Sequence, residues 1–434
     1  MHRFLRSVFC VLIALLALSH ARTADAQPKG RYSVSVITMS PGDPIFYRFG
    51  HNAILVHDAV ERVHLVFNWG TFEFEDDMAS KFLNGRLTYW LSVGDLAPQL
   101  RHYDKEGRWV VEQELALTDL QTLLLMQKLE ENARPENVKY RYHYYRDNCS
   151  TRVRDAVDGV IGGRLRAVSE GPARLTFRGQ TSRLVADVWA GYVFLNLAMG
   201  NYIDQPISEW EEMFVPDKVH EMLKKATNVD ETGKIVPLVR AERTLVKAPD
   251  RKPTPADPPS RTVPHLIVGL LVGALFGWLG NRFLSGMREN KGRATIPRAK
   301  RLALAIPLAL LTLLTGFLGS LFVFFWTMTD HEVAYHNENL LQTSPLSVAL
   351  LVVSIGIMVG WQWAIRSFRW VAYALAGMSI LGLILKLLPW FNQVNGDCIA
   401  LLMPIWIGIA AGPVLSEMRK KREVSNTATQ NAAA

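Results

Sequence analysis

Five long apolar segments occupy the last part of this 434-residue chain, and they constrain its fold more than any other feature. They cover about residues 265–285, 303–328, 346–365, 370–389 and 397–415. Each is close to the ~20 residues that a helix needs to cross the hydrocarbon core of a bilayer. The sequence therefore predicts an all-α membrane domain of five transmembrane helices over residues 265–415.

Basic residues give these segments an orientation. If the spans alternate, three basic stretches lie on the same side of the bilayer: the loop at residues 288–301, the turn at 366–369 and the tail at 419–422. By the positive-inside rule this side is the cytoplasm. Residues 416–434 are then a cytoplasmic basic tail, and the part before residue 265 faces outward. The net charge of +8 mostly reflects this orientation in the membrane. Nucleic acid is therefore not an expected partner.

The N-terminus predicts export of that outward part. Residues 1–6 are basic, residues 7–18 are apolar, and Ala24-Asp25-Ala26 fits the rule for signal-peptide cleavage. We therefore expect residues 1–26 to be a signal peptide. An uncleaved membrane anchor is the alternative.

Residues 30–237 have the pattern of an exported α+β domain. Alternation predicts strands near residues 32–39, 51–57, 63–68, 87–93, 108–117 and 140–145. Helices are expected over 119–132, from 149 onward and over 185–199. Residues 238–264 are rich in proline and charge and lack an apolar period, which predicts an extended linker.

One cysteine and one histidine in the exported part have the chemistry of a reactive pair. Cys149 stands at the expected start of a helix, where unpaired N–H groups lower a thiol pKa. His51 opens an expected strand and would exchange protons with the thiol. A third group usually orients the imidazole. His64 is the first choice and Asn68 the second, because both stand on the next strand with the same parity.

Other residues near the cysteine have simpler interpretations. Asn148 and Asp147 precede Cys149 and are expected to cap the helix. A disulfide between Cys149 and Cys398 is the alternative to a reactive thiol, since export compartments oxidise thiols.

A polar loop follows the second apolar segment. We expect His331, Asn337 and Asn339 of this loop, together with Arg152, to face substrate or lipid headgroups. His331 and His336 are conceivable metal ligands, but their spacing matches no strong metal motif, and neither a metal nor another cofactor is expected.

The order His51 then Cys149, each at the start of an element, resembles the circularly permuted NlpC/P60 papain-like group, which includes lecithin:retinol acyltransferase-like enzymes. Four blocks resemble the Lnb N-terminal periplasmic domain family more closely: residues 49–53 (FGHNA), 67–74 (FNWGTFEF), 147–152 (DNCSTR) and 203–216 (IDQPISEWEEMFVP). The loop at 330–341 is also similar to that family's pattern. His64 departs from it, because the family more often has an acidic residue there.

The resemblance implies a lipoprotein N-acyltransferase of the bacterial inner membrane, multi-pass, with its catalytic domain on the periplasmic side. Such an enzyme moves an acyl chain from a phospholipid, through a thioester on Cys149, to the N-terminal amine of a lipid-anchored protein. Two alternatives stay open on the residues alone. One is a membrane-tethered cysteine amidase or peptidase acting on cell-wall peptide, and the other is a non-catalytic envelope-binding membrane protein.

Overall fold

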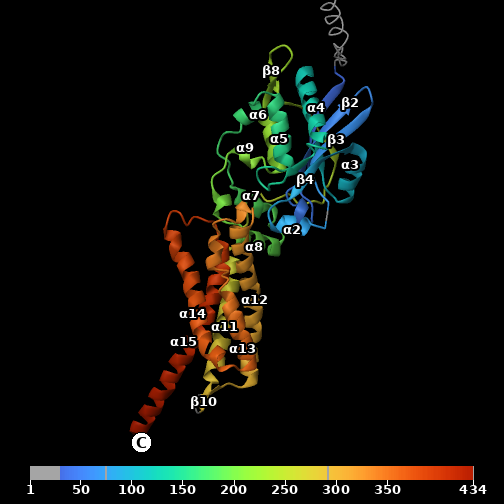
Figure 1. Cartoon of the computed structure of the whole chain (residues 1–434). Coiled ribbons are helices and arrows are strands. Elements are labelled where there is room, and N and C mark those ends of the chain that lie inside the picture. Colours follow the sequence, from blue (N-terminus) through green and yellow to red (C-terminus); the bar gives the residue numbers. More distant parts are fainter. Residues whose placement is uncertain (1–29, 74–75, 291–292, 434) are drawn as a thin grey trace, which may run out of the picture.

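The structure is a computed structural model that describes residues 30–73, 76–290 and 293–433. A mixed α/β domain sits at one end of a bundle of long helices (Figure 1). The expected signal peptide, residues 1–26, lies outside the described residues.

The domain is built on one antiparallel sheet. Its seven strands run in the order β6-β4-β3-β2-β1-β5-β9. They are β1 (Tyr32–Met39), β2 (His51–Asp58), β3 (Val63–Thr71), β4 (Thr88–Asp95), β5 (Val110–Leu115), β6 (Lys139–Arg141) and β9 (Val239–Val246). Strands β2 and β3 form the expected hairpin, with His57 opposite His64. Sequence alternation thus located most strands within a few residues.

Helices cover both faces of this sheet. The described helices of the whole domain are α2 (Met78–Leu83), α3 (Leu96–Lys105), α4 (Asp119–Ala133), α5 (Cys149–Val160), α6 (Arg164–Ala167), α7 (Phe177–Leu184), α8 (Trp189–Ala198), α9 (Glu209–Glu212) and α10 (Pro216–Lys225). Ile54 and Phe67 pack with α4, α5 and α10 in one core, whereas Leu55 and Val66 pack with Tyr103 of α3 in the other. Alternate residues of the strands therefore fill two separate cores. Short connections include η1 (Ile45–Tyr47), η2 (Asn201–Asp204) and the hairpin β7 (Thr227–Val229) with β8 (Ile235–Pro237).

Two boundaries differ from the sequence prediction. The strand expected over 140–145 ends at Arg141, because the chain then turns and the backbone of His143 pairs with that of Asp147. The expected linker begins too early, since β9 pairs with β5 along Val239–Val246 and belongs to the sheet. The proline-rich connection is therefore confined to residues 247–261.

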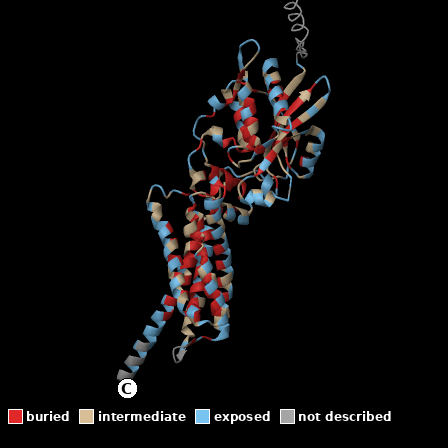
Figure 2. Ribbon diagram, in the orientation of Figure 1, coloured by how far each residue is buried: buried red, intermediate tan, exposed pale blue. Residues whose placement is uncertain are grey.

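The bundle contains α11 (Thr262–Ser285), α12 (Arg298–Met328), α13 (Ser347–Val359), α14 (Gln362–Ile384) and α15 (Gly396–Ala433), with the small hairpin β10 (Arg288–Asn290) and β11 (Arg293–Thr295). Buried residues line the inside of the bundle and exposed ones cover its outside (Figure 2). Many exposed side chains are large and apolar, such as Leu271 at 67 % and Leu310 at 65 %. Such a surface suits lipid rather than water.

The prediction of five spans is corrected to four. Four described helices are long and apolar enough to cross a membrane, whereas α13 has only 13 residues. Such a helix is about 20 Å long, short of a ~30 Å hydrocarbon core. The chain enters the bundle before α13 begins: Trp406 Nε1 donates to Gln342 O at 2.8 Å, and Gly319 of α12 leaves room for the backbone of Thr343. Gly360, with φ +97°, ends the helix.

The loop between α12 and α13, residues 329–346, joins the two parts of the molecule. It includes η3 (Glu332–Ala334) and η4 (Glu338–Leu341). The Asn337 amide donates to Leu197 O at 2.7 Å and to Ala198 O at 3.0 Å, and Asn339 donates to Asn196 O at 2.9 Å. Since carbonyls at a helix C-terminus lack partners within the helix, these amides fix the end of α8 onto the bundle.

Candidate active site

The start of α5 holds Cys149 in place. Asn148 caps the helix: its Oδ1 accepts from the N–H groups of Ser150 at 2.9 Å and Thr151 at 3.0 Å. Its side-chain amide donates to Tyr144 O and Phe214 O, at 2.9 and 3.0 Å. The capping role predicted for Asn148 is therefore observed. Asp147 has a different contact, because it forms an ion pair with Arg152.

His51 and Asn68 meet on neighbouring strands beside the thiol. The 2.5 Å contact between His51 Nε2 and Asn68 Oδ1 fixes the imidazole ring. His51 and Cys149 are close enough for each to shift the pKa of the other. With Nε2 donating to Asn68, the other ring nitrogen is left to exchange a proton with the thiol.

Gly70 makes this close arrangement possible. It stands at a bulge between β3 and β4 and has φ +92°, a conformation that favours glycine. A Cβ atom added there would lie 3.5 Å from Cys149 Cβ and 3.7 Å from His51 Cε1. Gly70 therefore leaves an atom-sized space between the thiol and the imidazole.

The electrostatics of the pair favour a thiolate. Burial alone raises the pKa of Cys149, but the charge and hydrogen bond of His51, with a bond from the Asn52 backbone, bring that pKa down to about 7. Burial lowers the pKa of His51 and is the largest single cause, but the charge of Cys149 and the hydrogen bonds with Cys149 and Asn68 together outweigh it, so the histidine pKa is raised. A thiolate–imidazolium pair is therefore stabilised near neutral pH.

We expect this pKa to appear in the rate of thiol alkylation. The thiolate is the reactive form, so the rate of Cys149 modification by iodoacetamide should rise with pH and level off above a midpoint near 7. Peptide mass spectrometry across pH 5–10 measures this rate for Cys149 separately from Cys398. A midpoint near 9, that of an ordinary thiol, would contradict the described pairing.

The prediction that the hairpin brings His64 alongside His51 is wrong. The register places His64 opposite His57, near the turn, and the two imidazoles contact each other through their Nδ1 atoms. His57 also contacts Glu112 at 3.1 Å. The structure thus brings together Cys149, His51 and Asn68, and it leaves His64 at the other end of the hairpin.

A pair of substitutions separates the two orienting candidates. We expect Asn68→Ala to slow turnover about tenfold to a hundredfold, because losing one buried hydrogen bond costs about 1–3 kcal/mol. His64→Ala should leave the rate within about twofold, since its side chain is exposed and away from His51. Initial rates of the two variants at pH 7 provide the measurement. The reverse ranking would restore His64 as the orienting group.

Three of the four residues expected to face lipid are buried, and the fourth, Arg152, is partly exposed. His331, Asn337 and Asn339 are buried, and their side chains bind backbone carbonyl groups; His331 Nε2 contacts Phe82 O at 2.6 Å. Arg152 pairs with Asp147, and its guanidinium lies 4.3 Å above the ring of Tyr140. These side chains hold the structure together instead of presenting donors to a headgroup.

The loop nevertheless approaches the site through a row of aromatic rings. The ring of Tyr142 stacks 4.2 Å from Tyr89 and meets Tyr144 at 5.8 Å, and Tyr144 lies 6.3 Å from His331. The charge of Cys149 acts on both Tyr89 and Tyr142. His331 is therefore connected to the surroundings of Cys149 through contacts between the rings of Tyr144 and Tyr142. Over the described ranges of the chain, no group of three metal-ligating side chains is present.

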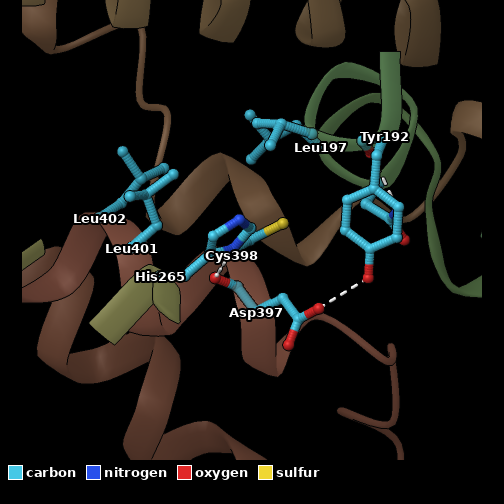
Figure 3. A pocket seen from close by; sticks show the side chains of 9 residues that line it. Tyr192, Leu197, His265, Asp397, Cys398, Leu401 and Leu402 are labelled. Carbon is cyan, nitrogen blue, oxygen red and sulfur yellow. Dashed lines mark hydrogen bonds between the residues drawn. The ribbon is translucent and has the colours of Figure 1, made fainter. Parts of the chain in front are cut away.

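The two described cysteines are both free, so the alternative of a disulfide is not observed. Cys398 is buried at the top of α15, in a small cavity between α8 and α11 (Figure 3). There Tyr192 Oη donates to Asp397 Oδ2 at 2.7 Å, and His265 Nδ1 lies 3.1 Å from Asp397 O. The hydrogen bond between Tyr192 and Asp397 connects α8 to the bundle. The residues that line this cavity are different from those around Cys149.

These features define a multi-pass membrane protein whose mixed α/β domain carries a paired thiol and imidazole. Residues 19–184 match the family model described as the Lnb N-terminal periplasmic domain. The match confirms the resemblance over these residues, which include the motifs at 49–53, 67–74 and 147–152; the blocks at 203–216 and 330–341 lie outside it. No curated protein and no solved structure matches the chain. The permuted papain-like topology therefore stays a prediction.

Proposed function

We propose that this protein is a lipoprotein N-acyltransferase that works through a thioester on Cys149. One observation carries the proposal: the Cys149–His51 pair belongs to a domain that buried hydrogen bonds fix onto a bundle of membrane-length helices. A soluble peptide substrate would not require this attachment. Substrates that are themselves anchored in a membrane would benefit from it, because anchoring lowers the entropic cost of bringing them together.

Apolar side chains at the junction of domain and bundle support a lipid substrate. They are large and exposed, and they lie on η1, α2 and α8: Ile45, Phe46, Phe82, Leu83, Trp189 and Phe194. Gly191 of α8 lies against Ile45, and Phe194 packs 6.5 Å from Phe322 of α12. The apolar outer surface of the bundle therefore continues onto the domain.

An aromatic path leads from this surface to the thiol. The ring of Phe46 is 58 % exposed and lies 6.2 Å from that of Phe72, which in turn stacks 5.0 Å from Tyr89. Tyr89 is close enough to Cys149 for the thiolate charge to raise the tyrosine pKa. An acyl chain lying along these rings would keep apolar contacts while its carbonyl group approached Cys149.

The reaction proceeds in two acyl transfers. The Cys149 thiolate attacks the ester carbonyl of a phospholipid, and the C–O bond to glycerol breaks while His51 protonates the leaving alkoxide. A lysophospholipid departs and the acyl group stays on sulfur. The neutral N-terminal amine of a lipid-anchored protein then attacks the thioester, His51 accepts its proton, and the thiolate leaves. The expected setting is the periplasmic side of the bacterial inner membrane.

An N-acylation assay tests this proposal. The purified protein is mixed with phosphatidylethanolamine and a synthetic diacylglyceryl-cysteine peptide, and the peptide is analysed by mass spectrometry. We expect a third acyl chain on the peptide amine. Release of peptide from cell-wall fragments without acyl transfer would identify the cysteine amidase instead. Failure of Cys149 to react with any ester or amide would support the non-catalytic membrane protein.

A further inference from the structure

The hydroxyl group of Tyr140 is buried near Cys149 and has no role in the features described so far. Tyr140, on β6, is 8 % exposed, and its hydroxyl has no hydrogen-bond partner among the described residues. A buried hydroxyl without a partner costs roughly 1–3 kcal/mol. Such groups are uncommon in folded proteins, and one that faces a reactive thiol suggests a partner that arrives with the substrate.

The hydroxyl of Tyr140 borders the space that Gly70 leaves open. The Cβ position of Gly70 lies 4.0 Å from Tyr140 Oη, 3.5 Å from Cys149 Cβ and 3.7 Å from His51 Cε1. The three side chains therefore border one small space, which is about large enough for a single heavy atom. A substrate carbonyl placed near this point would lie between the Cys149 side chain and the hydroxyl, and a small displacement towards Tyr140 would bring its oxygen into hydrogen-bonding distance.

The backbone around Cys149 supplies few other donors. The N–H groups of Ser150 and Thr151 donate to Asn148 Oδ1, and that of Arg152 donates to Asn148 O at 3.0 Å. These three amides of the helix start are thus engaged within the cap. The donors left beside the sulfur are the N–H of Cys149, the backbone of Asn52 and the hydroxyl of Ser150, which lies 3.8 Å from Cys149 Sγ. Since the last two already contact the sulfur, a further donor such as Tyr140 would help to stabilise an oxyanion.

The surroundings of Tyr140 keep its hydroxyl in the donor form. Burial, and next the negative charge of Cys149, raise the pKa of this tyrosine, so it stays protonated at neutral pH. Arg152 stacks on the ring at 4.3 Å and is held there by Asp147. A cation on the ring face draws electron density from the phenol and makes the hydroxyl a stronger donor.

We infer that the Tyr140 hydroxyl donates a hydrogen bond to the oxyanion that forms when the Cys149 thiolate adds to an acyl carbonyl. The S–C bond forms as the carbonyl π pair moves onto oxygen, and this oxygen accepts from Tyr140 Oη. When the intermediate collapses, the pair returns to the carbonyl and the leaving group departs with a proton from His51. The hydroxyl keeps its own proton throughout. The inference rests on acyl transfer at Cys149, which is the proposed function.

Tyr140→Phe tests this role, because phenylalanine keeps the ring under Arg152 and removes only the donor. Two reactions of the purified full-length protein are compared. Acylation of Cys149 by p-nitrophenyl butyrate passes through an oxyanion, whereas alkylation by iodoacetamide does not. We expect the variant to be acylated about 10²-fold more slowly, with alkylation rate and pH midpoint unchanged. Tyr202→Phe, in a separate cluster beside Arg146, is the matched control and should match the wild type in both reactions.

Equal acylation rates in wild type and Tyr140→Phe would overturn the inference. A parallel loss of acylation and alkylation would also overturn it, because Tyr140 would then act on the thiol itself. Failure of the proposed function has a different signature. In that case the wild type reacts with p-nitrophenyl butyrate but not with phospholipid, and the comparison of the two proteins on the small ester still decides the role of Tyr140.

Discussion

Cys149→Ser is expected to lower the N-acylation rate more than about 10³-fold while the protein stays folded. The site is tuned for a thiol, since His51 and the Asn52 backbone together hold the Cys149 pKa near 7. A serine hydroxyl in the same place would stay protonated, because its pKa is far higher and burial disfavours its anion. Initial rates with phosphatidylethanolamine and a diacylglyceryl lipopeptide provide the measurement.

Cys398→Ala is the matched control for this substitution. Cys398 is the other free cysteine of the described chain, and it lies in the cavity beside Tyr192 and Asp397. The control variant should keep wild-type activity and lose only the Cys398 alkylation product. Full activity of Cys149→Ser, or loss of activity in Cys398→Ala alone, would remove Cys149 from the mechanism.

His51→Ala should have the next largest effect, with a loss of about 10²- to 10⁴-fold in turnover. The imidazole supplies the charge that offsets the burial of the thiol, so its removal should also move the Cys149 pKa upward, above its ordinary value of 9. Alkylation of the variant at pH 7 should therefore be slow and should keep rising past pH 9. His64→Ala controls for the loss of a histidine from the same hairpin, and its alkylation profile should match the wild type. An unshifted midpoint in His51→Ala would show that the imidazole does not stabilise the thiolate.

The sequence predicted most strands and the proximity of Cys149 and His51, and the error over His64 came from neglecting register. Parity correctly put His64 and Asn68 on one face of β3. Their positions along the strand determine which of the two reaches His51: Asn68 does, and His64 lies near the turn. The observed register pairs Asp58 with Val63; the same pairing continued along the hairpin puts His51 opposite Gly70, two residues from Asn68. The polar turn at residues 58–62 contained this information, because turn length fixes register in a hairpin.

Other features depend on contacts that no local pattern encodes. The predicted span over residues 346–365 is apolar throughout, but Gly360 ends α13 after 13 residues and Gln362 already begins α14. Strand β9 was assigned to the linker because its partner β5 is more than 100 residues earlier in the chain. No local pattern assigned a role to Tyr140, or to Gly70 beyond its place in the motif at residues 67–74. Their importance comes from the space they share with Cys149, which only the folded arrangement creates.

The most direct test is the mass of the protein after it meets a phospholipid. The full-length protein is incubated with phosphatidylethanolamine carrying deuterated acyl chains, digested and analysed by mass spectrometry, with and without hydroxylamine. We predict one deuterated acyl group on the peptide that contains Cys149, removed by hydroxylamine and transferred to the amine of an added diacylglyceryl lipopeptide. An unmodified Cys149, with the deuterated chain elsewhere or on no residue, would contradict the thioester mechanism.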